Sequence, residues 1–290
     1  MCCPDSDGVV PARIKKAYFT AVNGGVSNQK GILMKRLLSV FLLLPCLQGC
    51  SPEDAPAADA PAPKTQYRVF IEQSHPPFIM HGGDQASGFE YEILEAIGKK
   101  EGFSLHYTPY LWAELFDALQ QGKADIISAG ITVTDARKSK MLFANPHFET
   151  ESVLLVHKNS NIKSFNDIIG KKIAAKKGTV QEQIVQQYQK GYGQVVDIPT
   201  TWMSVSRTMT AQTDGAVGDF GVMQYYTKQY GSQYGLELIR DPKAVKEQLA
   251  FAVKLGNSEL QGKLNSGLAK IKADGSYERI YQKWFGETHK

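Results

Sequence analysis

The chain has 290 residues, about twice an average domain, which leaves room for one large core or two smaller ones. Its composition, with 42% hydrophobic and 21% charged residues, 26 glycines and 13 prolines, excludes a collagenous, coiled-coil or wholly disordered chain. The formal net charge of +4 lies entirely in residues 1–49, because the remaining residues hold 27 acidic and 27 basic side chains. A nucleic-acid-binding domain usually carries a basic excess, so this balance argues against nucleic acid as a partner.

A short apolar run stands near the beginning of the chain. Lys35 and Arg36 follow Met34 and precede residues 37–44, which are apolar except for one serine. As a helix this run rises only about 12 Å, whereas a membrane span needs roughly 20 residues. We therefore predict a signal peptide over residues 34–49 and not a membrane span.

The leader ends in Leu47-Gln48-Gly49-Cys50, which resembles a bacterial lipobox and implies a lipidated Cys50. An ordinary secretory signal with a chance cysteine is the alternative. The Pro-, Ala- and Asp-rich stretch that follows cannot bury a core, so we expect residues 50–66 to be a lipid-anchored flexible linker. The protein would then be periplasmic or at the cell surface, anchored to the membrane through Cys50. Residues 1–33 are expected to be an upstream extension, with translation starting at Met34.

Cysteine placement limits the chemistry of the folded part. The four cysteines are Cys2, Cys3, Cys46 and Cys50, so the chain beyond them has no disulfide, thiolate nucleophile or cysteine-ligated metal. No cluster of histidines or carboxylates has metal-ligand spacing. We therefore expect no metal and no cofactor.

From Tyr67 onward, short apolar strands alternate with amphipathic helices, a pattern typical of an α/β fold. The first cycle is predicted to contain a strand at 68–71, helices at 90–100 and 111–121, a strand at 124–128 and a short helix capped by Thr134. The second is predicted to contain a short helix at 164–170, a strand at 172–175, a helix ending at 189, a strand at 195–198, a helix at 204–212 and a strand at 215–217. Two such cycles predict two lobes.

The boundaries of the lobes follow from the segments between the cycles. Two β-rich segments, 151–157 and 248–254, flank the second cycle and are candidates for paired strands that cross between the lobes. A helical tail at 258–285 is expected to pack on the first lobe. We therefore assign residues 67–150 to lobe 1, 151–249 to lobe 2 and 250–290 to a return to lobe 1, with a ligand cleft between the lobes.

Six motifs then stand in a characteristic order. They are Pro76-Pro77-Phe78, residues 88–92 (GFEYE), residues 129–137 (AGITVTDAR), Gly178-Thr179, residues 214–216 (DGA) with Asp219 beyond them, and an ending of GSY at 275–277 with WFG at 284–286. Over residues 67–290 the chain resembles the family 3 solute-binding proteins of amino-acid ABC importers. The resemblance implies the bilobal periplasmic-binding-protein fold of type II, with two α/β lobes joined by two crossing strands.

Elementary chemistry gives some of these residues a role in binding a free amino acid, whose carboxylate and ammonium groups each need a partner when buried. Arg137 presents a planar fork that can hold a carboxylate with two hydrogen bonds, and Thr132 can add a hydroxyl. The turn at Gly178, Thr179 and Val180 enters a helix and offers backbone N–H groups to the same carboxylate. Val180 stands where the family more often has threonine, which removes a hydroxyl but keeps the N–H.

The resemblance adds partners for the ammonium group. It implies that the Gly130 carbonyl accepts a hydrogen bond from the ammonium and that Asp219 supplies the negative charge. Each residue also has a plainer explanation, because Arg137 can be a surface ion-pair residue and Asp219 can be the N-cap of the following helix.

The resemblance also outlines a pocket for the ligand side chain. His75 and Trp112 would flank it, with Glu72 and Lys176 at its polar end. A carboxylate alone favours a basic ligand, whereas the added lysine favours glutamine or another polar amino acid equally well. The alternatives are that Glu72 and Lys176 pair with each other and that His75 is an ordinary loop residue.

We therefore expect a monomeric, lipid-anchored, non-enzymatic protein that captures a free amino acid and passes it to the permease of an ABC importer. The fold also hosts cyclohexadienyl dehydratases acting on prephenate or arogenate, but those need a general acid in the cleft. They place a carboxylate just after the strand that carries Asp219, where this chain has Phe220-Gly221-Val222, although Glu72 is a possible acid. A ligand sensor for a signalling partner is a further alternative.

Overall fold

The computed structural model describes residues 65–82 and 85–286. The predicted upstream extension, signal peptide and lipidation site, with nearly all of the linker, lie outside these residues. Among the helices that the structure describes, none combines the length and hydropathy required to span a bilayer.

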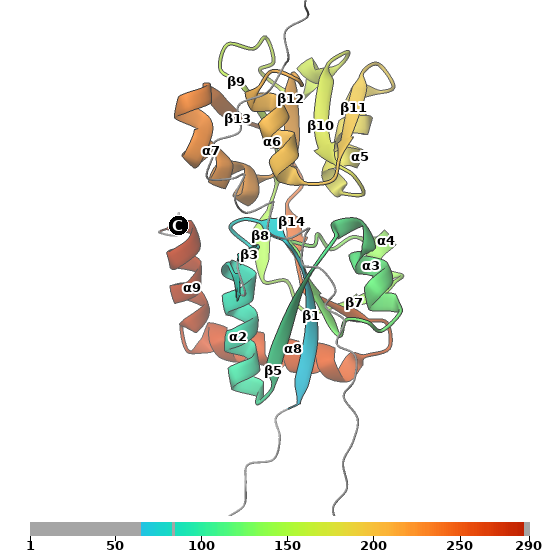
Figure 1. Cartoon of the computed structure of the whole chain (residues 1–290), viewed down its shortest axis with the longest axis vertical. Helices are drawn as coiled ribbons and strands as arrows, with labels where there is room; N and C mark the ends of the chain where they lie inside the picture. The colour runs from blue at the N-terminus through green and yellow to red at the C-terminus, as the bar shows by residue number, and fades with distance from the viewer. Residues whose placement is uncertain (1–64, 83–84, 287–290) are drawn as a thin grey trace, which may run out of the picture. The chain divides into compact units, whose positions relative to one another are not determined.

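The α/β prediction is confirmed, and the first lobe is built on a five-stranded sheet with the order β5-β1-β6-β15-β7. Strand β1 pairs in parallel with both β5 and β6, whereas β15 runs antiparallel to β6 and β7. Its strands are β1 (Gln66–Glu72), β5 (Ser104–Tyr110), β6 (Ile126–Ser128), β7 (Met141–Phe143) and β15 (Ala252–Lys254). Its helices are α2 (Phe89–Glu101), α3 (Trp112–Gln120), α4 (Asp135–Lys138), α8 (Ser258–Ala273) and α9 (Ser276–Phe285) (Figure 1).

The second lobe repeats this plan with the strand order β11-β10-β12-β9-β13. Strands β11, β10 and β12 are parallel, and β9 runs antiparallel between β12 and β13. Its strands are β9 (Ser152–His157), β10 (Lys172–Lys176), β11 (Gln194–Ile198), β12 (Gly215–Asp219) and β13 (Leu236–Arg240). Its helices are the 3₁₀ turn η1 (Phe165–Ile168), α5 (Val180–Gln189), α6 (Thr201–Met209) and α7 (Phe220–Tyr234).

The crossing between the lobes differs from the prediction. Segment 151–157 does not cross, because β9 lies within the second sheet, and segment 248–254 is divided between two strands. The crossing pair is β8 (Phe148–Thr150) and β14 (Glu247–Leu249), which are antiparallel. The burial of the two strands explains this difference. Strand β9 is buried on both faces, which is typical of a strand inside a covered sheet. Strand β14 alternates between buried and exposed residues, as a strand outside such a sheet can.

The loop after β1 forms a small sheet of its own. Strands β2 (Ser74–His75), β3 (Ile79–Gly82) and β4 (Gln85–Ser87) pair antiparallel. The loop between β2 and β3 carries the predicted Pro76-Pro77-Phe78 motif. Phe78 is fully buried and stands edge-on to Phe148 of the crossing strand β8, which fixes this loop at the junction of the lobes.

The helical tail covers one face of the first lobe, where α8 and α9 pack against α2 (Figure 1). Leu260, Leu264 and Leu268 recur every four residues along α8 and are buried, as expected for an amphipathic helix. One predicted helix in the second lobe begins earlier than expected, at Thr201 instead of Ser204. The cause is Thr200, whose hydroxyl accepts the Met203 N–H at 3.2 Å and caps α6.

Candidate functional site

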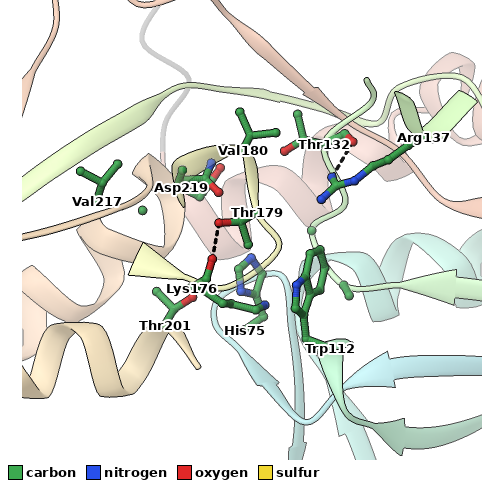
Figure 2. Close-up of a pocket in the computed structure, with 14 residues that line it drawn as sticks. His75, Trp112, Thr132, Arg137, Lys176, Thr179, Val180, Thr201, Val217 and Asp219 are labelled. Atoms are coloured by element: carbon green, nitrogen blue, oxygen red, sulfur yellow. Dashed lines mark hydrogen bonds between the residues drawn. The ribbon is translucent and has the colours of Figure 1, made fainter. Parts of the chain in front are cut away.

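A pocket lies between the two lobes, at the ends of the strands and in the loops that follow them, and residues from both lobes line it (Figure 2). It gathers most of the predicted binding residues: His75, Trp112, Gly130, Thr132, Arg137, Lys176, Thr179, Val180 and Asp219. Glu72 is the predicted residue that does not line it. The lining also includes residues that the sequence analysis missed: Ala129, Gln181, Thr201, Val217 and Gly218.

The strand order explains why these residues meet. Lys176 and Asp219 are the last residues of β10 and β12, and Thr179 caps the helix α5 that follows β10. In the first lobe, the loop after β6 carries Gly130 and Thr132. Loops at the carboxyl ends of parallel strands gather at one edge of a sheet, which is where open α/β sheets bind ligands.

Arg137 is held in the pocket wall by its backbone and by its guanidinium group. Thr134 caps α4 and accepts the Arg137 N–H at 3.3 Å, as the sequence predicts. The guanidinium donates to the Thr132 carbonyl at 2.8 Å and, across the cleft, to the Gly178 carbonyl at 3.3 Å. Since a guanidinium has five N–H donors, these two contacts leave others for a ligand.

The charge of Arg137 is not neutralised by direct contact. It forms no salt bridge within the described residues, and its guanidinium carbon lies 5.5 Å from the Trp112 ring centroid and 5.2 Å from that of Phe116. Burial lowers the pKa of Arg137 to about 10, while the Glu247 carboxylate opposes this shift. The group is therefore still a cation at neutral pH.

Two of the predicted carboxylate donors are already occupied. The Thr132 hydroxyl donates to Glu247 Oε2 at 3.2 Å, and the Gly178 N–H donates to Glu182 Oε2 at 2.6 Å. Both carboxylates were overlooked because neither belongs to a recognised motif. The first amides of α5, at Val180 and Gln181, have no acceptor within the helix and are directed by the helix dipole toward an anion.

Gly130 is in a backbone conformation that favours glycine. Its φ is +60°, and an added Cβ would lie 2.5 Å from Nε2 of His75. The Gly130 N–H is 3.2 Å from both carboxylate oxygens of Glu90, which is fully buried and also contacts Ser128 and His147. This buried carboxylate fixes the peptide that forms the floor of the pocket.

Asp219 has two different carboxylate oxygens. Oδ1 accepts the Val222 N–H at 3.3 Å and caps α7, so the plainer explanation of this residue holds for one oxygen. Oδ2 is buried and has no hydrogen-bond partner within the described residues. Burial, together with the negative charge of Glu247, raises the pKa of Asp219 to about 7, while the neighbouring Thr150 hydroxyl and the first amides of α7 oppose this shift. A buried oxygen without a partner at a pocket wall is a natural acceptor for a cationic ligand group.

Glu72 and Lys176 do pair with each other, as the alternative explanation holds. Their side chains are buried and Oε2 lies 2.5 Å from Nζ, joining β1 of one lobe to β10 of the other. Burial raises the pKa of Glu72 and lowers that of Lys176, and their mutual attraction opposes both shifts. Lys176 Nζ also lies 3.9 Å from the Trp112 ring centroid, so the lysine faces the pocket with Glu72 behind it.

His75 and Trp112 complete this end of the pocket. His75 is buried, and burial, with the positive charge of Lys176, lowers its pKa well below the usual value, so the ring is neutral. The Trp112 indole N–H donates across the cleft to the Lys177 carbonyl at 3.1 Å. The two lobes are therefore in contact around the pocket, which is the closed arrangement of the cleft. The described residues contain no group of three or more potential metal ligands.

Two opposed α/β lobes that present a guanidinium and a carboxyl group to one pocket, neither of them in a salt bridge within the described residues, define a class of protein that encloses a small polar ligand. The comparisons agree, because the family model for bacterial extracellular solute-binding proteins, family 3, matches residues 67–287. The chain belongs to this family.

Individual relatives resemble the chain over most of its length. The amino-acid-binding protein AabA of Dichelobacter nodosus is 30% identical over 228 residues, which cover 76% of this chain and 88% of AabA. An ancestral arginine-binding protein, solved with glutamine and with arginine, is 33% identical with a TM-score of 0.72, covering 77% of this chain and 99% of that chain. The ancestral amino-acid-binding protein AncCDT-1, a precursor of cyclohexadienyl dehydratase, is 29% identical with a TM-score of 0.70 over 76% of this chain and 95% of its own.

The raised pKa of Asp219 gives a testable pH dependence. In the unfolded chain an aspartate titrates near 3.9, so between about pH 4 and 7 the folded state binds more protons, and stability falls as the pH rises through this window. The slope is at most about 1.4 kcal/mol per pH unit. Carboxyl ¹³C NMR should show one aspartate titrating near pH 7, and chemical denaturation should show the slope. Asp219→Asn should remove both, and a wild-type signal that titrates near 4 would contradict the assignment.

Proposed function

We propose that this protein captures a free amino acid by closing its two lobes around it and delivers it to an ABC importer. The observation that carries the proposal is the opposition, in one pocket, of two ionisable groups that form no salt bridge within the described residues. The Arg137 guanidinium comes from the first lobe, and the free Oδ2 of Asp219 comes from the second. Family membership supports this function, since the relatives are named as amino-acid-binding proteins.

Both ends of an α-amino acid find partners in this pocket. Its carboxylate would accept from Arg137 and from the first amides of α5 at Val180 and Gln181, and its ammonium group would donate to Asp219 and to the Gly130 carbonyl. Burying either charge without a partner would cost several kcal/mol. The pocket therefore selects a zwitterion over a molecule with only one of the two charges.

Closure follows from the origin of these partners. Arg137 and Gly130 belong to the first lobe, and Asp219 and Val180 to the second, so a ligand gains all of its contacts only when the lobes approach. Its differential affinity for the closed arrangement drives the hinge motion. The closed form would then be the one that the permease receives.

The side-chain end of the pocket favours a polar, uncharged ligand such as glutamine over a basic one. Lys176 lines the pocket, whereas Glu72 lies behind it, so the pocket offers N–H donors that suit an amide oxygen. A basic side chain would need Lys176 to leave Glu72. The ancestral relative that was solved with both glutamine and arginine indicates how close these two specificities are.

We infer a binding protein and not an enzyme. The residues after Asp219 that open α7 contain no carboxylate, and Glu72, the acid that the sequence offered, is engaged by Lys176. Turnover of prephenate or arogenate by the purified protein would instead favour a dehydratase. A sensor would use the same closure to contact a signalling partner, and transport assays in a permease deletion separate the two roles.

The affinity for an amino acid should depend on the guanidinium group of Arg137. Isothermal titration of the protein against the common L-amino acids should find a ligand, and Arg137→Lys should weaken its binding by about a hundredfold, because a single ammonium cannot reproduce the fork. The melting temperature without ligand should change little. Lys138→Ala, on the same helix but exposed, is the matched control and should bind normally. Undiminished affinity in Arg137→Lys would refute the assigned carboxylate site.

Lys176 should set the choice between glutamine and arginine. In Lys176→Met the apolar stem is kept while the ammonium is lost, which leaves Glu72 facing the pocket. We expect the ratio of arginine to glutamine affinity to rise about tenfold or more, measured by titration with each ligand. The double variant Glu72→Gln, Lys176→Met should lose this gain. An unchanged ratio would show that the ligand side chain lies elsewhere.

Lipid anchoring through Cys50 remains a proposal that rests on the lipobox resemblance. Expression of the full chain with Cys50→Ser should move the protein from the membrane fraction to the soluble fraction, and labelling with a palmitate analogue should be lost. Cys46→Ser, four residues earlier, should leave both unchanged. A Cys50→Ser protein that stays membrane-bound would rule out this anchor.

A further inference from the structure

A third carboxylate adjoins the pocket and belongs to neither of its assigned ends. Glu247 is the first residue of the crossing strand β14 and is buried. Its Oε2 accepts from the Thr132 hydroxyl and from the Gln181 amide, each at 3.2 Å, and its Oε1 accepts from the Ser152 hydroxyl at 2.5 Å. Two of these donors, Thr132 and Gln181, line the pocket.

The donors come from parts of the molecule that move differently. Thr132 is tied to the crossing strand, because it forms a β-bridge with Leu249 and the next residue donates its N–H to Gln248 at 2.8 Å. It therefore stays beside Glu247 in any arrangement of the lobes. Gln181, in contrast, is on α5 of the second lobe, so its bond to Glu247 joins that lobe to the crossing strand in this closed arrangement.

A second bond orients Gln181 in the closed cleft. Its amide nitrogen also donates to the Ser152 hydroxyl at 3.1 Å, and Ser152 in turn donates to Glu247. The three side chains thus form a buried ring of hydrogen bonds beside the first amides of α5. A hydrogen bond to a buried carboxylate is stronger than one between neutral groups.

We propose that Glu247 is a positioning residue that acts as a closure latch: it holds Gln181 of the second lobe against Thr132 of the first and so slows the reopening of the cleft. The latch contributes to the closed arrangement with or without a ligand. Its effect on ligand retention rests on the proposed function, whereas its effect on the lobes does not.

Two substitutions separate the hydrogen bonds from the charge. Glu247→Ala removes every acceptor of the latch. Glu247→Gln keeps it, because an amide oxygen placed at Oε2 still accepts from Thr132 and Gln181, and the amide nitrogen can donate to Ser152. Gln181→Leu removes the same contact from the other lobe and serves if Glu247→Ala does not fold, which thermal denaturation reports.

The kinetic test uses stopped-flow measurements on the full chain with L-glutamine and L-arginine as probes. Glu247→Ala and Gln181→Leu should each raise the dissociation rate constant about tenfold, leave the association rate constant within about twofold, and show little further effect when combined. Glu247→Gln should stay within about threefold of the wild type. An unchanged dissociation rate in Glu247→Ala, or equal effects of Glu247→Ala and Glu247→Gln, would overturn the latch.

A second readout needs no ligand. The Trp112 indole N–H is bonded across the cleft to the Lys177 carbonyl in this closed arrangement. ¹⁹F NMR of protein labelled with 5-fluorotryptophan should therefore report closure, with Trp112→Phe used to assign the signal among the three tryptophans. Glu247→Ala should reduce the closed signal and Glu247→Gln should keep it. If no amino acid binds the wild type, the proposed function fails while this comparison still decides the latch. Equal closed populations in the three proteins, or no closed signal in the wild type under any condition, would overturn it.

Discussion

The structure depends on the electrostatic cost of holding opposite charges inside a cleft without letting them meet. Arg137 and Asp219 line the same pocket, yet each is satisfied only in part, one by backbone carbonyls and the other by a helix N-terminus. A direct salt bridge between them would lower the free energy of the empty cleft. A ligand would then have to break that salt bridge, and its affinity would fall. The fold keeps them apart by giving each a separate lobe, and under the proposed function a zwitterion would provide a partner for both.

Two neighbouring charged residues, unlike Arg137 and Asp219, do form a direct salt bridge. Glu72 and Lys176 also come from opposite lobes, but they meet directly at 2.5 Å and are buried together. In the closed arrangement each charge compensates the other, because either one buried alone would be costly, and the pair gives the pocket a polar end. Trp112, which contacts the ammonium of Lys176 and donates to the next residue's carbonyl, joins this contact to the pocket wall.

Much of this arrangement could be predicted from the amino-acid sequence because it depends on local signals. Alternating apolar periods predicted the two α/β lobes, and Thr134 was predicted to cap the short helix that carries Arg137. What could not be predicted depends on contacts between residues distant in the chain. Glu247 precedes an ordinary β-rich run and has no local mark of function, and its contact with Gln181 spans 66 residues. The crossing strand was misplaced because short apolar segments look alike until their burial is known.

The connection between the lobes has a mechanical consequence. Two chain segments cross there, and β8 and β14 are hydrogen-bonded to each other, with Glu247 opposite Thr150 and Leu249 opposite Phe148. A ladder of this kind resists sliding and stretching but allows bending and twisting about its own length. Rotation is therefore the easiest relative motion of the lobes, and under the proposed function the size of an enclosed molecule would set how far they rotate and which closed shape a permease meets.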